Sequence, residues 1–237
     1  MIDTHCHLLP LLDDGPKSEG EAVELARQLV GSGVTAVVCT PHFSRRYATS
    51  HELAGDRLLE LEVLLFDAAI SISLSLAAEI SPAFAVSSPP DELLARSIGG
   101  RFLLVELEPT TPAAFLDTAL DELGELGLRP VFAHPERCRA LREQPRLLDE
   151  ARAGGAVFQV VAPSLTGRWG EDVALAAWRL LDGGVVDLLG SDSHRARSAA
   201  HLERAAALIE QRHGLDLLEE LSERRPAQVV GGIPRPS

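Results

Sequence analysis

Short apolar runs rich in β-branched residues alternate with longer segments of helical periodicity along most of the chain. The apolar runs predict a short strand at the N-terminus and further strands at 34–39, 70–78, 102–105, 130–133, 156–161 and 185–189. The helical patterns between them cover 18–31, 51–68, 112–126, 145–153, 170–182 and 198–212. Ser18, with Glu21 three residues later, predicts a capping box at the start of the first helix. This alternation is typical of parallel strands joined by helical crossovers.

The number of strand–helix units predicts the fold class. About seven units follow one another with no linker rich in Pro, Gly or Ser, which favours an α/β protein with a closed or nearly closed barrel in a single domain over residues 1–237. A doubly wound open sheet is the alternative. The segment 229–237 is expected to be an irregular tail.

Composition narrows the classes of function. The chain has 237 residues and a formal net charge of −13, which argues against a nucleic-acid partner held by a basic face. No segment reaches the roughly 18–20 apolar residues of a membrane span. Three cysteines in a chain long enough to bury a core indicate a reducing compartment. With no basic leader or apolar signal core at the N-terminus, we expect a cytoplasmic protein.

Candidate chemistry lies where the predicted strands end. Five of the eight histidines and several carboxylates stand at or near these carboxyl ends: His5, His7, His42, Glu79, Glu106, His134, Asp192 and His194. In a parallel barrel all the strand carboxyl ends open on the same face. Alternate strand residues share a face, so His5 and His7 converge while Cys6 points into the core. Imidazoles and carboxylates together suit divalent transition metals, and carboxylates can also bridge neighbouring ions.

Other catalytic signatures are weak or missing. Cys39 has Arg45 six residues later, which is the C-x5-R spacing of cysteine-based phosphatases, but this cysteine lies inside an apolar strand and is expected to be structural. No G-x-S-x-G elbow is present. The paired glycines at 99–100 and 154–155 fit turns before strands, because the Lys-Ser/Thr ending of a P-loop is absent. These observations leave metal-dependent chemistry as the favoured interpretation.

The motifs along the chain resemble those of a known superfamily. The string MIDTHCHLLPLLDDGPKS, followed in order by TPHF, AAEI, VELE, AHPER and SDSH, resembles the PHP (polymerase and histidinol phosphatase) metallohydrolases. Within them the chain is most similar to the bacterial manganese-dependent protein-tyrosine phosphatases of the capsule and exopolysaccharide type (CpsB/YwqE-like), from Met1 to about residue 230. The resemblance implies a distorted (β/α)7 barrel of the PHP type with a trinuclear metal centre.

The resemblance also implies a ligand set. His5 and His7 would hold one ion with Glu79 and Asp192; Glu79 would bridge to a second ion held by Glu106 and His134; and Asp14, His42 and His194 would complete the third.

Several positions in this set stay open. Asp13 competes with Asp14 as a ligand, and Glu108 competes with Glu106. Asp3 is expected to orient a ligand imidazole by a hydrogen bond rather than to bind metal. The Q-x-N segment of the family appears here as Gln159-Val160-Val161, without the Asn.

The implied activity is that of a metal-dependent phosphomonoester hydrolase. Divalent ions would lower the pKa of a bridging water, which attacks phosphorus in line. Arg137 and Arg197, or Arg195 in place of Arg197, would grip the phosphate, and Asp192 is a candidate general acid. Mn²⁺ is the expected metal, in two or three copies, although Fe, Zn or Co would also suit these ligands.

The resemblance implies a phosphotyrosine-bearing protein as partner, namely the tail of a bacterial tyrosine kinase in capsular or exopolysaccharide synthesis. One alternative is a phosphatase for histidinol phosphate or another small molecule. A second is a metal-binding regulatory partner of a polysaccharide kinase without catalytic activity. The sequence indicates neither the oligomeric state nor the physiological substrate.

Overall fold

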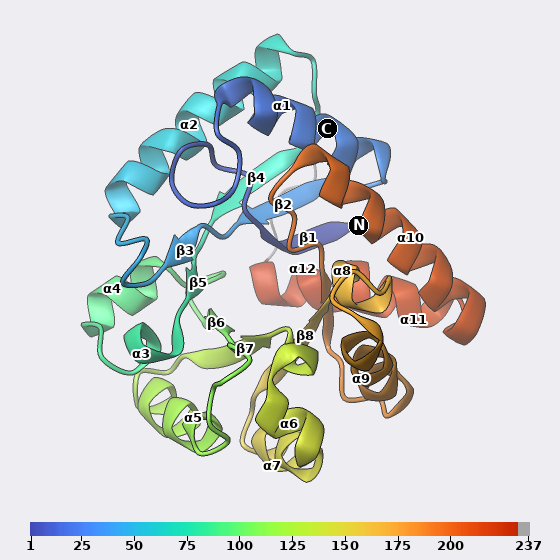
Figure 1. Cartoon of the computed structure of the whole chain (residues 1–237). Coiled ribbons are helices and arrows are strands. Elements are labelled where there is room, and N and C mark those ends of the chain that lie inside the picture. The colour runs from blue at the N-terminus through green and yellow to red at the C-terminus, as the bar shows by residue number, and fades with distance from the viewer. Residues whose placement is uncertain (232–237) are drawn as a thin grey trace.

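Parallel strands lie at the centre of the molecule with helices packed around them (Figure 1). The computed structural model describes residues 1–231. Its strands are β1 (Ile2–Cys6), β2 (Ala36–Cys39), β3 (His42–Phe43), β4 (Ser73–Leu76), β5 (Glu79–Ile80), β6 (Phe102–Glu106), β7 (Arg129–Ala133), β8 (Val157–Val161) and β9 (Leu188–Gly190). Each strand run expected from the sequence is present, so the predicted mixed α/β architecture is confirmed.

The six predicted helices are all present. They are α1 (Glu19–Gly31), α2 (His51–Asp67), α5 (Phe115–Glu125), α7 (Arg146–Ala153), α9 (Glu171–Asp182) and α10 (Ala196–His213). Ser18 caps α1 by accepting from the backbone N–H of Glu21 at 3.2 Å. The capping box is only half formed, because the Glu21 carboxylate accepts from the backbone of Lys17 rather than Ser18.

The sequence pattern did not predict several short helical pieces. These are α3 (Pro82–Ala85), α4 (Pro90–Ala95), η1 (Pro135–Arg137), α6 (Arg139–Glu143), α8 (Ala162–Leu165), α11 (Leu215–Glu219), the π-helical η2 (Glu220–Arg224) and α12 (Arg225–Val230). Most of these pieces contain too few turns for a 3.6-residue hydrophobic period to be visible. The last three are contiguous, but their π-helical middle segment departs from that period. Val229 and Val230 belong to α12, so the expected irregular tail was wrong for these two residues, and 232–237 lie outside the described residues.

The strands pair in two parallel sheets. The orders are β1-β2-β4 and β3-β5-β6-β7-β8-β9, with β3 and β5 following β2 and β4 after two-residue gaps. β1 meets the end of β9 through an isolated parallel bridge between Cys6 and Ser193. The backbone N–H of Asp192 also donates to the carbonyl of His5 at 2.9 Å. Parallel pairing is therefore confirmed, whereas closure into one seven-stranded barrel stays a prediction.

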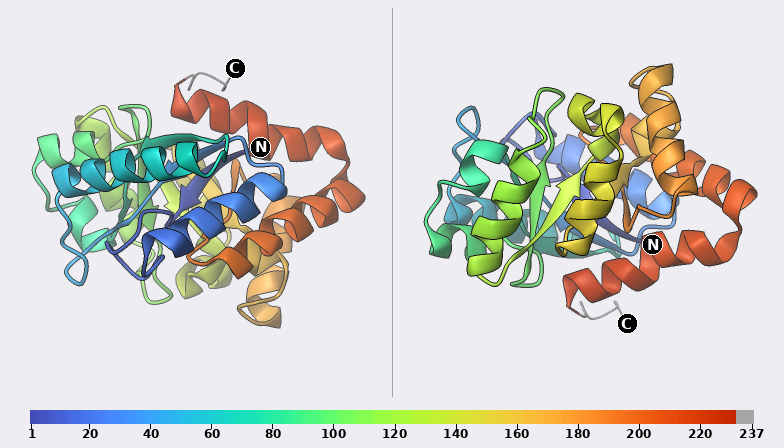
Figure 2. Two further views of the ribbon diagram at one scale, coloured as in Figure 1. Left: turned by 90° about the horizontal axis from the view of Figure 1, so that it is seen from above. Right: turned by 90° about the horizontal axis from the view of Figure 1, so that it is seen from below.

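Alternation along the strands separates the core into layers. Leu103 and Val105 of β6 point outward into an apolar layer under the helices, while Leu104 points to the opposite side. That opposite side forms a separate apolar cluster, which Val229 and Val230 of α12 join. Figure 2 shows α12 on the side of the strands that faces away from the viewer of Figure 1. The amino-terminal side of the strand layer is thus filled by hydrocarbon, which leaves the carboxyl ends for polar groups.

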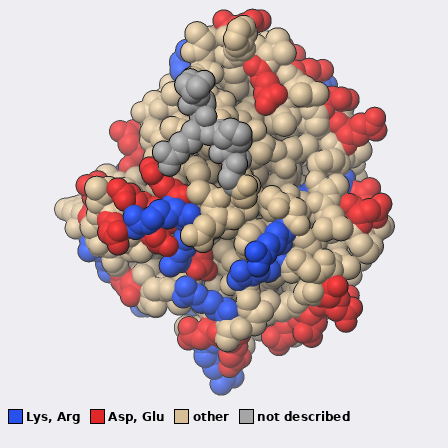
Figure 3. Space-filling view, turned by 180° about the vertical axis from the view of Figure 1, so that it is seen from behind, with Lys and Arg blue, Asp and Glu red and all other residues tan. Residues whose placement is uncertain are grey.

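Charge on the rear surface is dispersed. Seen from behind (Figure 3), acidic side chains are spread around the edge and basic ones gather in a few small groups. This face of the molecule therefore carries no broad basic surface. Among the residues described, no helix combines the length and the apolar composition that a membrane span requires.

Candidate metal centre

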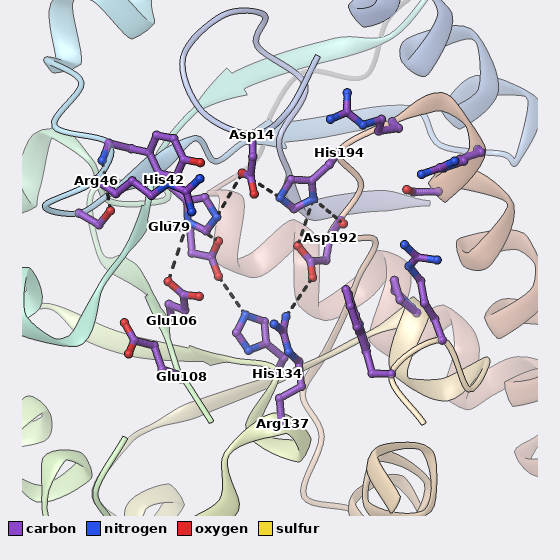
Figure 4. A pocket seen from close by; sticks show the side chains of 18 residues that line it. Asp14, His42, Arg46, Glu79, Glu106, Glu108, His134, Arg137, Asp192 and His194 are labelled. Carbon is purple, nitrogen blue, oxygen red and sulfur yellow. Dashed lines mark hydrogen bonds and ion pairs between the residues drawn. The ribbon is translucent and has the colours of Figure 1, made fainter. Parts of the chain in front are cut away.

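The loops and strand ends on one face bring the predicted ligand residues together (Figure 4). His5 lies within β1, His42 and Glu79 begin β3 and β5, and Glu106 ends β6. The remaining members follow strands: His7 after β1, Asp14 in the loop before α1, His134 after β7, and Asp192 and His194 after β9. The geometric expectation from the strand ends, that distant residues meet on one side of the molecule, is confirmed.

Glu79 lies at the centre of the group. Its side chain is 1% exposed, and its Oε1 accepts from His134 Nε2 at 3.0 Å. Its Oε2 lies 3.3 Å from His5 Nε2, 3.2 Å from His7 Nε2 and 3.1 Å from His42 Nδ1. Burial by itself would raise the pKa of Glu79, but the charges of His5 and His42 outweigh it and hold the pKa well below the ordinary value. Glu79 is therefore a buried carboxylate in its ionised form.

Hydrogen bonds fix the tautomers of the two β1 histidines. Nδ1 of His5 lies 2.8 Å from Gln159 Oε1, and Nδ1 of His7 lies 2.7 Å from Asp13 Oδ2. An amide or carboxylate oxygen can only accept, so each Nδ1 carries a proton, and the neutral form of each ring presents a lone pair at Nε2. Both Nε2 atoms are buried without a hydrogen-bond partner, and each lies 3.7 Å from Asp192 Oδ1.

When both rings are neutral, four acceptor atoms converge with no proton between them: the two Nε2 atoms, Glu79 Oε2 and Asp192 Oδ1. Burying converging lone pairs is costly unless a cation lies among them. Nitrogen and oxygen donors of this kind are those that divalent transition metals prefer. The residues present thus fit a metal site.

Three groups have ligand atoms that all lie within 4.8 Å of one another: His7, Asp14, His42 and His194; His5, His7 and Asp192; and His42, Glu79 and Glu106. Their membership differs from the partition that the resemblance implies, because His7 and His42 each belong to two groups. His134 joins none of the three and instead donates from its Nε2 to Glu79 Oε1 at 3.0 Å. How ions divide among these ligands stays a prediction.

The structure separates the two neighbouring aspartates. Asp14 Oδ1 faces the histidines, 3.3 Å from His194 Nε2 and 3.6 Å from His42 Nε2. Asp13 turns away, accepting from His7 Nδ1 and from the backbone N–H of His42 at 3.0 Å. The geometry therefore favours Asp14 as the ligand, while Asp13 contacts the far side of the His7 ring and orients it.

Glu106 and Glu108 differ in depth. Glu106 is partly buried, and its Oε2 lies 3.9 Å from His42 Nδ1. Burial and the charge of Glu79 raise the pKa of Glu106 to about 7. Glu108 is exposed and lines the outer part of the same cavity. The geometry favours Glu106 as the ligand.

Asp3 was expected to orient a ligand imidazole by a hydrogen bond, and this expectation was wrong. Asp3 Oδ1 accepts from the backbone N–H groups of His5 and Ser191, at 3.2 and 3.0 Å, and contacts no imidazole by hydrogen bond. Gln159 orients His5 instead, and its Nε2 donates to Thr4 Oγ1 at 2.7 Å. The signal in the sequence was an amide in the middle of the apolar strand 156–161.

Gly190 allows Gln159 to pack against His5. A Cβ at this glycine would lie 2.9 Å from both the Gln159 side chain and the His5 Cβ. Two ligand positions also require unusual backbone: His134 and Asp192 have positive φ angles of 40° and 49°. Left-handed backbone is strained for residues other than glycine and concentrates at functional sites.

A cavity of about 560 Å³ opens above the ligands and carries the predicted phosphate-binding arginines. Arg137 Nη1 lies 3.4 Å from Asp192 Oδ2, and Arg195 and Arg197 also line the cavity. The lining also includes Arg46, Tyr47, Arg168 and Trp169, which the sequence did not single out. Tyr47 stacks on His42 with ring centroids 5.6 Å apart, which makes it part of the wall beside the ligands.

The comparisons with known proteins agree with this geometry. A family model described as "Capsular polysaccharide synthesis, CpsB/CapC" matches residues 1–231. CapC of Staphylococcus aureus is 32% identical over 196 residues, covering 82% of this chain and 77% of that protein. The tyrosine-protein phosphatase YwqE of Bacillus subtilis is 28% identical over 226 residues, covering 94% and 89%.

A solved structure is similar over the full length. It comes from a crystallographic study of YwqE from Bacillus subtilis and CpsB from Streptococcus pneumoniae, described there as metal-dependent tyrosine phosphatases. The TM-score is 0.86 at 27% sequence identity, with 100% of this chain and 99% of that chain covered.

Proposed function

Because this chain belongs to the CpsB/CapC family of capsular polysaccharide synthesis, we propose that it is a metal-dependent protein-tyrosine phosphatase. The observation that carries the proposal is the convergence of imidazole nitrogens on the buried carboxylate of Glu79. The residues proposed to hold the ions are His5, His7, Asp14, His42, Glu79, Glu106, His134, Asp192 and His194. We propose Mn²⁺ as the metal. Bound there, divalent ions activate water as a nucleophile and neutralise charge on phosphoryl oxygens.

Arg137 and Arg197 are the residues proposed to bind the phosphate. Both line the cavity above the ligands, and a guanidinium can hold two phosphoryl oxygens at once. Asp192 Oδ2 forms an ion pair with Arg137 Nη1 and so positions this guanidinium beside the ligands.

Asp192 acts as an ionised ligand rather than as a proton donor. Burial would raise its pKa, but His5 nearby outweighs this and lowers it. A tyrosine leaving group has a pKa of about 10 and needs little help from an acid.

The substrate proposed is a phosphotyrosine-bearing protein of the capsule machinery, with the tyrosine kinase of that machinery as the partner. We also propose that the seven strand units form one distorted barrel in a single domain, with the isolated bridge between β1 and the end of β9 as its seam. The cytoplasmic location expected from the sequence stays a prediction.

The test combines metal analysis with substrate comparison. Protein purified without chelator is analysed for bound metal, then assayed with Mn²⁺ on a phosphotyrosine peptide and on histidinol phosphate. We expect metal to be present and the peptide to be hydrolysed with the higher kcat/KM. Preference for histidinol phosphate would identify a small-molecule phosphatase, and bound metal with no hydrolysis of either would identify a regulatory protein.

A further inference from the structure

The two sides of the cavity mouth differ in charge. Arg46 shares its side with Glu106 and Glu108 (Figure 4), and Arg46 and Glu108 also line a common groove next to the main cavity. The opposite side is formed by the loop after α8 and the start of α10, which contribute Arg168, Arg195 and Arg197 to the cavity wall. One side is therefore mixed in charge and the other is basic.

Trp169 connects the basic side to the phosphate-binding region. Its side chain is 44% exposed, although it is a large aromatic group. The guanidinium of Arg137 lies 5.0 Å from its ring centroid, and that of Arg168 lies 5.3 Å from it. Cation–π contact with a Trp face holds a guanidinium in place while leaving its N–H groups free to bind. Arg168 and Arg137, the arginine proposed to bind phosphate, thus contact the same indole ring.

Among the described residues, Arg168 has no acidic partner. Some exposed arginines elsewhere are paired with carboxylates, namely Arg27, Arg139, Arg212 and Arg224, so Arg168 differs from these in having no ion pair. Within residues 1–231 neither Arg168 nor Arg197 has a carboxylate within 4.0 Å, and Arg195 has one exposed contact with Glu21 at 3.5 Å. In a chain of net charge −13, unpaired arginines gathered at one side of a cavity indicate that an anionic group binds there.

We propose that Arg168, Trp169 and Arg195 form a docking surface for acidic side chains on one flank of the phosphotyrosine. The inference rests on the proposed function and deepens it, because it defines which phosphotyrosine sequences are preferred. Carboxylates of Asp or Glu match the planar donor fork of arginine. The other flank of the peptide would pass two arginines and two carboxylates, Arg45, Arg46, Glu106 and Glu108. Their charges oppose one another, so acidic residues on that flank bring little gain.

The expected effect follows from the exposure of these arginines. Solvent-exposed ion pairs contribute about 0.2–1 kcal/mol, which corresponds to roughly a 1.4- to 5-fold change in kcat/KM for each arginine. Screening by salt reduces it further, since the Debye length shortens to about 3 Å at 1 M ionic strength.

The experiment uses the metal-loaded full-length protein and three phosphotyrosine peptides of equal length. One has neutral flanks, one has Asp residues only before the phosphotyrosine, and one has Asp residues only after it. We expect one acidic peptide, and not both, to exceed the neutral peptide in kcat/KM. In Arg168→Gln the ratio of that acidic peptide to the neutral one should fall about two- to fivefold, and added salt should lower the wild-type ratio.

Arg101→Gln is the matched control. Arg101 is equally exposed and lies 5.6 Å from the ring of Phe102, but it precedes β6 at the opposite end of the strands. Its substitution should change neither the ratio nor the hydrolysis of p-nitrophenyl phosphate. Arg195→Gln serves as a second variant should Arg168→Gln fail to fold.

The possible outcomes distinguish failure of the docking surface from failure of the proposed phosphatase activity. Equal kcat/KM for the three peptides, or a ratio that neither arginine variant nor salt lowers, would overturn the docking surface and leave the phosphatase intact. Equal gains from acidic residues on both flanks would overturn its one-sided character. Hydrolysis of p-nitrophenyl phosphate without hydrolysis of any peptide would reject the proposed function, and the inference with it.

Discussion

The cavity has a floor, formed by the residues proposed to bind metal, and a rim, formed by the exposed side chains at its mouth. The two regions follow different physical rules. On the floor, Glu79, His5 and His7 are almost fully buried, and each is held by hydrogen bonds or close polar contacts. On the rim, Arg168 and Trp169 are exposed, and the Trp169 ring contacts the guanidinium groups of Arg137 and Arg168. Charge at the floor interacts in a medium of low dielectric, whereas charge at the rim is screened by water. The floor therefore determines whether chemistry occurs, and the rim determines which substrates are preferred.

The largest effect is expected at Glu79. Glu79→Gln keeps the shape but removes the negative charge that four imidazoles surround. Loss of metal-dependent stabilisation worth about 4 kcal/mol corresponds to a decrease in kcat on the order of a thousandfold. Steady-state kinetics with Mn²⁺, together with metal analysis of the variant, measure it.

Glu108→Gln is the matched control for that variant. It removes the same charge from an exposed position in the same cavity, and we expect less than about a threefold change in kcat. A large loss in Glu108→Gln with near-normal Glu79→Gln would reverse the assignment of floor and rim.

The strand-end pattern was sufficient to locate this floor for two reasons. Alternation along a strand can be read from neighbouring residues, and parallel pairing places all the carboxyl ends on one side. His5 and His7 share a face through the two-residue period of β1, and Glu79 and His134 each stand beside a strand end. The supporting contacts could not be predicted in the same way. The bond from Gln159 to His5 joins positions 154 residues apart, and it depends on the close approach that Gly190 permits.

The rim was less predictable than the floor for a related reason. Arg168 and Trp169 lie in an irregular turn, where no periodicity indicates which way a side chain points. The short α12 and the two-sheet division were missed because they depend on tertiary packing, for example of Val229 and Val230 beneath the strands.

Removing the metal should destabilise the fold, and more so at higher pH. Binding at 100 times Kd contributes about 2.7 kcal/mol, which for a chain of this length is roughly 5–10 °C in Tm. Glu106 supplies the pH dependence: its pKa of about 7 in the folded protein exceeds its ordinary value of 4.5. This favours the folded state below the unfolded pKa, and the benefit is lost as pH rises through 7.

Cations offset the ionised Glu106, and protons compete with them for the ligands at low pH. The rise in Tm caused by Mn²⁺ should therefore be larger at about pH 8 than at about pH 6. Differential scanning fluorimetry with Mn²⁺ and with chelator measures it. A Tm that is unaffected by either addition would contradict a floor built around ions.

Gln159→Leu tests whether the hydrogen bond that orients the His5 ring is needed for metal binding. The substitution removes the acceptor of His5 Nδ1 and replaces the amide with an apolar side chain of similar size. Loss of such an orienting partner costs about 10- to 100-fold in metal affinity or activity. Metal titration followed by calorimetry would show weaker binding, with the far-ultraviolet spectrum unchanged.

Gly190→Ala should act through the same contact, because its Cβ would displace the Gln159 side chain. Gly55→Ala provides the control, since nothing lies within 4 Å of that position in α2. Normal metal affinity in Gly190→Ala would show that Gln159 is not needed to orient His5.

The smallest of these effects is expected at Arg137, which belongs to both regions. Its guanidinium contacts Asp192 on the floor and the Trp169 ring on the rim. Arg137→Lys keeps the charge but loses the two-pronged donor and the planar stacking group, so we expect about a tenfold loss of kcat/KM on phosphotyrosine peptides. If binding is the main contribution, KM rises more than kcat falls. A kcat lowered as far as in Glu79→Gln would instead place Arg137 wholly with the floor, whereas an effect confined to acidic peptides would place it with the rim.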